Sequence, residues 1–138
     1  MYLNHLNLTV TNVSEAIYLF ETYFDFKCIE IKGYNMVAVL KGADDFELVL
    51  MNANMNQKGG HSYPDAFHIG FMLDDPQYVT KIYKKLKAGG ITLERLPQKI
   101  RDNFGFYFHF DNIMIEVGAA LNDDENDDIT LDSSMRSI

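Results

Sequence analysis

The chain has 138 residues and a mass of 15.9 kDa, a length that suits one domain of ordinary size. It is 47% hydrophobic and 23% charged, and its ten Phe and eight Tyr supply enough apolar area for a core, which excludes disorder as the main state. The net charge of −8 would repel a polyanion, so nucleic acid is not expected as a partner.

Three features bear on where the protein works. No apolar run approaches the roughly 18–20 residues that a membrane helix needs, so no membrane association is expected. The first residues have neither a basic region nor an apolar region of the kind that signal peptides carry. The single cysteine, Cys28, excludes an intramolecular disulfide and any cysteine-based metal cluster. We therefore expect a cytoplasmic protein.

The negative charge is concentrated at the end of the chain. Residues 122–138 hold six acidic residues and one basic residue, Arg136. Such a segment is typical of a solvated tail. The sequence predicts one domain over residues 1–120, made of modules 1–52 and 65–118 with a linker at 53–64, followed by an acidic, flexible tail at 121–138.

The first module reads as strand, helix and three strands. Residues 5–10 alternate with period 2, with Leu6, Leu8 and Val10 on one face. Ser14 is the expected N-cap of the helix that follows. Further strands are predicted at 28–31, 36–40 and 46–51. The polar residues of the first strand share its other face: His5, Asn7 and Thr9.

The second module repeats this order. A strand is predicted at 67–71, and Asp75 followed by Pro76 marks the start of a helix that Gly89 ends. Three more strands are predicted, at 91–95, 105–110 and 113–117. The duplication indicates an α+β fold of two βαβββ modules, in which each sheet has helices on one face and a polar concave face on the other.

Each module places a His in its first strand and a Glu in its last strand. These four residues interrupt apolar strands, where a carboxylate is costly unless it is paired or binds a metal. Imidazole and carboxylate groups together suit Zn, Ni, Co, Mn or Fe. The pattern predicts one divalent metal ion bound by His5, Glu47, His68 and Glu116.

The final hairpin predicts a second group of polar residues. A two-residue turn at Asp111 and Asn112 would place Tyr107 across from Glu116 and His109 across from Met114. Tyr107 and His109 would then share the polar face with Glu116. Together with two residues of the first strand, they are the predicted substrate contacts: Asn7, Thr9, Tyr107 and His109.

These motifs resemble the vicinal oxygen chelate superfamily, which includes glyoxalase I, fosfomycin-resistance thiol transferases and bleomycin-resistance proteins. The resemblance covers about residues 1–118. It rests on four motifs in a fixed order: LNHLNLTV at 3–10, FHIGF at 67–71, KAGGI at 87–91 and IMIEV at 113–117. The family fold is two βαβββ modules that form a cupped sheet around a metal, as the internal repeat predicts.

The resemblance also implies a chemistry. The ligand set of glyoxalase I matches His5, Glu47, His68 and Glu116, which implies a metal-dependent lyase or isomerase. Such an enzyme moves a proton on a small oxygenated substrate through a metal-chelated enediolate, with Glu116 or Glu47 as the base. Family members of this size also imply a homodimer. Two alternatives remain: a fosfomycin-type thiol transferase using only His5, His68 and Glu116, and a metal-free protein that binds a small molecule, as bleomycin-resistance proteins do.

Overall fold

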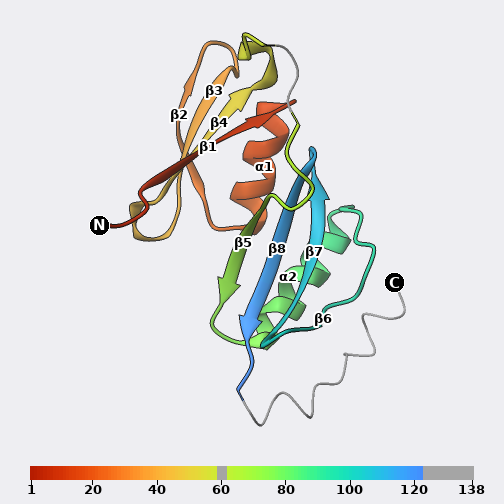
Figure 1. Cartoon of the computed structure of the whole chain (residues 1–138). Coiled ribbons are helices and arrows are strands. Elements are labelled where there is room, and N and C mark those ends of the chain that lie inside the picture. Colours follow the sequence, from red (N-terminus) through yellow and green to blue (C-terminus); the bar gives the residue numbers. More distant parts are fainter. Residues whose placement is uncertain (59–61, 123–138) are drawn as a thin grey trace. The chain divides into compact units, whose positions relative to one another are not determined.

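A computed structural model of the chain describes residues 1–58 and 62–122, so most of the predicted tail lies outside the described residues. The chain divides between Ser62 and Tyr63 into two compact units, each containing one of the predicted modules (Figure 1). Whether the two form a single domain stays a prediction. Within the described ranges, neither helix combines the length and apolar character that crossing a membrane requires.

The first unit is a four-stranded mixed sheet with one helix. The strands lie in the order β1-β4-β3-β2, with β1 parallel to β4 and the other pairs antiparallel. A one-turn 3-10 helix precedes β4 and another follows it. The elements are β1 (His5–Val10), α1 (Val13–Tyr23), β2 (Lys27–Lys32), β3 (Val37–Lys41) and β4 (Glu47–Asn52).

Helix α1 begins earlier than the sequence predicted. Asn12, not Ser14, is the N-cap: its backbone is extended and its side-chain oxygen accepts a hydrogen bond of 3.0 Å from the amide of Glu15. Asn caps a helix as well as Ser does. Because the helix starts at Val13, the side chain of this residue joins the buried face of the helix, where it is only 1% exposed. The prediction of Ser14 as the cap is wrong because it left this apolar residue outside the helix.

The second unit has the same topology, with strand order β5-β8-β7-β6 and β5 parallel to β8. The helix starts and ends as predicted, because the side chain of Asp75 accepts from the amide of Gln77 at 2.9 Å and Gly89 follows the last turn. The elements are β5 (His68–Leu73), α2 (Pro76–Ala88), β6 (Gln98–Ile100), β7 (Asn103–Phe110) and β8 (Ile113–Ala120).

The strand predicted at 91–95 is wrong. This segment is irregular, and the strand that pairs with β7 is the short β6. Ile100 pairs with Asn103 across a two-residue turn in which Arg101 has a φ of 53°. That tight turn fixes the register of the hairpin, and Pro97, which has no N–H to donate, precedes the strand. Residues 91–95 alternate in the sequence but make no strand pairing.

In each unit the helix covers one face of the sheet, and the apolar core lies between them. Figure 1 shows α2 along one face of the second sheet. The other face carries the predicted polar residues together with some apolar ones, such as Val49 beside Asn7 and Met114 beside His68. The final hairpin also has the predicted register: Asp111 and Asn112 adopt φ values of 48° and 65°, and Tyr107 pairs with Glu116.

Candidate functional site

The first unit brings His5 and Glu47 together. They are direct partners in the parallel pairing of β1 with β4, so both side chains lie on the polar face of the sheet. The next residue along this row is Lys41 of β3, whose Nζ lies 3.9 Å from Oε1 of Glu47. Glu47 is therefore held by a lysine on one side and faces the predicted histidine ligand on the other.

The second unit brings His68 and Glu116 together. Nε2 of His68 lies 3.4 Å from Oε1 of Glu116, and the glutamate is the more enclosed, with 17% of its side chain exposed. Glu116 is the partner of Gly70, two residues beyond His68 on the same face of β5. Because Gly70 has no side chain, the carboxylate can lie across this position and reach the imidazole.

In both His5 and His68, Nδ1 has a hydrogen-bond partner within its own chain segment, which leaves Nε2 available for another contact. Nδ1 of His68 lies 3.0 Å from the carbonyl oxygen of Ala66, which only accepts, so this nitrogen carries the proton. In the neutral ring the lone pair is then on Nε2, facing a carboxylate oxygen. Nδ1 of His5 lies 3.2 Å from Oδ1 of Asn4 in the same way. This is how a metal-binding histidine is usually oriented.

Two acceptors 3.4 Å apart need a proton or a cation between them. An imidazole nitrogen and a carboxylate oxygen that share one ion at about 2.1 Å, at an angle of about 90–110°, lie about 3.0–3.4 Å apart. The pair of His68 and Glu116 therefore fits a divalent ion. Within residues 1–58 and 62–122, no three His, Cys, Asp or Glu side chains meet at one point. Each unit brings together two of the four predicted ligands.

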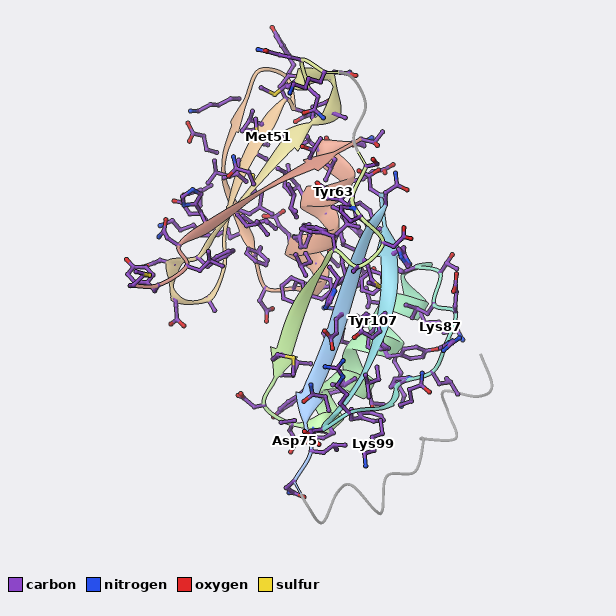
Figure 2. All side chains as sticks on the ribbon, viewed as in Figure 1. Met51, Tyr63, Asp75, Lys87, Lys99 and Tyr107 are labelled. Carbon is purple, nitrogen blue, oxygen red and sulfur yellow. The ribbon has the colours of Figure 1, made fainter. Side chains whose placement is uncertain are left out.

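Tyr107 contacts both members of the second pair. Its ring packs edge-on against the imidazole of His68, with 5.7 Å between centroids, and its phenol donates a hydrogen bond to Glu116. Desolvation raises the pKa of the phenol, and the charge of Glu116 and the hydrogen bond to it raise the pKa further. The phenol therefore stays protonated and keeps donating to the carboxylate. Figure 2 shows Tyr107 on β7.

The other predicted substrate contacts lie on the polar faces of their own sheets. Asn7 donates to Sδ of Met51 at 3.5 Å, and Thr9 is the strand partner of that methionine. His109 is the partner of Met114, which is also the partner of His68. Asn7 and Thr9 thus share a sheet face with His5, and His109 shares a sheet face with His68.

A cavity of about 460 Å³ lies in the second unit, between β7 and the chain that leads into β6. This is a usual size for a small-molecule site. The sequence predicted Tyr107 and His109, which line it, but missed Glu94 and Arg95 because that segment was assigned to a strand. The remaining lining residues are Thr92, Leu96, Gln98, Ile100, Phe106, Phe108 and Met114.

Comparison with known proteins agrees with this geometry. Residues 2–119 match the model of the glyoxalase/bleomycin resistance protein/dioxygenase superfamily. A search of curated proteins found no match. Among solved structures, a possible glyoxalase from Bacillus cereus is 36% identical, with a TM-score of 0.72 over 85% of this chain and 97% of that one.

Two more distant structures share the fold. A lactoylglutathione lyase from Agrobacterium tumefaciens is 17% identical, with a TM-score of 0.66 over 86% of this chain and 92% of that one. A genomically encoded fosfomycin resistance protein from Listeria monocytogenes is 20% identical, with a TM-score of 0.68 over 87% and 93%. With the match over residues 2–119, this chain belongs to the glyoxalase/bleomycin resistance protein/dioxygenase superfamily.

Proposed function

We propose that the chain is a metal-dependent lyase or isomerase of the glyoxalase I type, acting on a small oxygenated substrate by proton transfer. The observation that carries this proposal is the pair of His68 and Glu116, in which a lone-pair nitrogen faces a carboxylate oxygen at 3.4 Å. That arrangement is suited to a cation and is costly without a cation or a proton. It lies beside a cavity large enough for a substrate.

The proposed metal ligands are His5 and Glu47 from the first unit and His68 and Glu116 from the second. Two imidazoles and two carboxylates suit Zn, Ni, Co, Mn or Fe. When bound, the ion would supply Lewis acidity toward the substrate oxygens. We propose a homodimer in which each site combines the two pairs.

Glu116 is the proposed general base. Its side chain is more enclosed than that of Glu47, 17% against 36% exposed, and its Oε1 lies 3.4 Å from Nε2 of His68. Tyr107 would steer it through the phenol hydrogen bond. Glu47 is the weaker candidate because Nζ of Lys41 lies 3.9 Å from its carboxylate and would compete with substrate for it. In this proposal Asn7, Thr9, Tyr107 and His109 contact the substrate.

The test is the Glu116→Gln variant with two measurements. Bound metal is measured by elemental analysis after loading, and turnover is measured with methylglyoxal and a thiol, together with exchange of the substrate proton with deuterated solvent. We expect the variant to keep part of its metal and to lose turnover by about 100-fold or more, as for the loss of a general base. Full turnover in Glu116→Gln would contradict the assignment of the base. A wild-type protein that catalyses no exchange would contradict the lyase proposal itself.

The ion pair of Lys41 with Glu47 favours a second candidate. If Lys41 keeps Glu47 away from the ion, the ligand set is reduced to His5, His68 and Glu116, as in a fosfomycin-type thiol transferase. The Glu47→Gln variant separates the two candidates. Retention of metal and of thiol addition to fosfomycin in this variant would support the transferase, whereas loss of metal would support the four-ligand lyase.

A further inference from the structure

The cavity of the second unit adjoins the proposed metal ligands along one wall. Tyr107 and Met114 both line it. Tyr107 donates a hydrogen bond to Glu116, and Met114 is the strand partner of His68. A ligand that fills the cavity would therefore have one end beside the carboxylate and imidazole.

The wall formed by the segment before β6 carries one charge of each sign. Glu94 and Arg95 both line the cavity and both are exposed. In the part of the chain that the structure describes, neither forms an ion pair with the other or with a third residue. A ligand with a single charge would satisfy only one of the two groups. A ligand that carries both an anion and an ammonium would satisfy both, and complementary charges select a partner in this way.

The rest of the lining sets the character of the remaining part of the ligand. Leu96, Ile100 and Met114 are apolar, and they lie in the same cavity as the two charged residues. Burial of an apolar group against them is favourable in proportion to the area removed from water. The cavity thus matches a zwitterionic head joined to an apolar body.

We propose that this cavity binds the α-amino acid head of its ligand, with the carboxylate on Arg95, the ammonium on Glu94 and the apolar body over Leu96 and Met114. This inference rests on the proposed function in one respect: it places the ligand beside Glu116, the proposed general base. It names the class of substrate as an amino acid derivative.

The test uses the full chain after treatment with EDTA, so that binding does not depend on metal. Three probes share a phenyl group and differ in charge: L-phenylalanine, 3-phenylpropanoate and 2-phenylethylamine. Their dissociation constants are measured by titration calorimetry. We expect L-phenylalanine to bind about 2- to 5-fold more tightly than either singly charged probe, which is the range that one exposed ion pair contributes.

Three variants locate the two charges. Arg95→Gln should bring L-phenylalanine down to the affinity of 2-phenylethylamine, and Glu94→Gln should bring it down to that of 3-phenylpropanoate. Lys99→Gln is the control, because Lys99 lies on the adjacent β6 (Figure 2). It is exposed and does not line the cavity. It should leave all three affinities unchanged.

Four results would overturn the inference: no binding of L-phenylalanine, equal binding of the three probes, no change in Arg95→Gln, or an equal loss in Lys99→Gln. Metal content of the protein before EDTA treatment is measured separately. A protein that takes up no metal but discriminates among the probes would contradict the proposed function and leave the amino acid site standing. A protein that takes up metal but binds the three probes equally would contradict the amino acid site and leave the proposed function standing.

Discussion

Gly70 and Glu116 are partners in the pairing of β5 with β8, and a methyl group at position 70 would lie 3.4 Å from Oε1 of the glutamate. The absence of a side chain at this position leaves the carboxylate free to reach His68. In the first unit the corresponding position, two residues after His5, is Asn7, and its partner on β4 is Val49. The two His and Glu pairs are thus built differently: Glu47 stands beside its histidine, and Glu116 reaches diagonally over a glycine.

A graded series at position 70 tests this role. Gly70→Ala places a carbon at van der Waals distance from the carboxylate and should change metal affinity little. Gly70→Val adds two methyl groups and should displace the carboxylate, weakening metal binding by about 10-fold or more, as when a group that supports a metal ligand is lost. Metal titrations with a competing chelator measure both, and thermal unfolding checks that the fold is kept. Equal affinities of Gly70→Val and the wild type would show that Glu116 does not need this space.

Lys41 should weaken metal binding in the wild type. Its Nζ lies 3.9 Å from Oε1 of Glu47 and 4.0 Å from Oδ1 of Asp45, so it competes with a metal ion for the glutamate. The pair is partly exposed, and such pairs contribute about 0.2–1 kcal/mol. Lys41→Met should therefore raise metal affinity by only about 2- to 5-fold.

Lys27 provides the matched control for this measurement. It is the partner of Lys41 on the edge strand β2, has the same charge and makes no ion pair among the described residues. Lys27→Met removes one positive charge from the same row of the sheet without freeing Glu47. An equal gain in affinity in both variants would mean that net charge, and not the release of Glu47, is responsible.

The order of strands and helices along the chain was predictable from periodicity, apart from the strand before β7. Alternation defined β1, β5, β7 and β8, and the turn at Asp111 and Asn112 fixed the final register because both residues tolerate positive φ. At 91–95 the same alternation is present, yet the segment forms no strand and the short β6 pairs with β7 instead. Periodicity shows which residues can share a face, but strand pairing depends on turns elsewhere in the chain. For the same reason Glu94 and Arg95 could not be assigned to the cavity.

The pairs of His and Glu could be predicted from the sequence because each lies on a polar face that alternation identifies. The diagonal reach of Glu116 over Gly70 could not be predicted, since it depends on the register of parallel strands joined by a helix, which no local turn fixes. The contact of Lys41 with Glu47 could not be predicted from the sequence for a related reason. It ends a strand of apolar residues, and only the pairing of β3 with β4 places it opposite Glu47.

The start of α1 gives a prediction about stability. Asn12→Ala removes the hydrogen bond to the amide of Glu15 and should lower the free energy of unfolding by about 1 kcal/mol. Ser14→Ala should change it by only a few tenths of a kcal/mol, since Ser14 lies inside the helix and is exposed. Urea denaturation of the two variants measures the difference. A larger loss in Ser14→Ala would restore Ser14 as the cap.

The final prediction concerns whether each metal site combines ligands from two chains. Each unit holds one His and one Glu of the predicted ligand set, so a four-ligand site requires a pair from each unit. If the proposed homodimer forms each site from the first unit of one chain and the second unit of its partner, His5→Ala and Glu116→Ala are each inactive alone. After subunit exchange, half of the dimers are mixed, and each mixed dimer has one intact site and one with both defects. About a quarter of the wild-type metal sites and turnover should therefore return.

The control for this experiment is a mixture of His5→Ala with Glu47→Ala. Both substitutions lie in the same pair of the first unit, so every site of a mixed dimer contains one of them and no recovery is expected. Recovery in the first mixture only would show that sites are shared between chains. No recovery in either mixture, with dimers shown by light scattering and exchange shown by mass tagging, would mean that each chain closes its own site. A monomer at micromolar concentration would lead to the same conclusion.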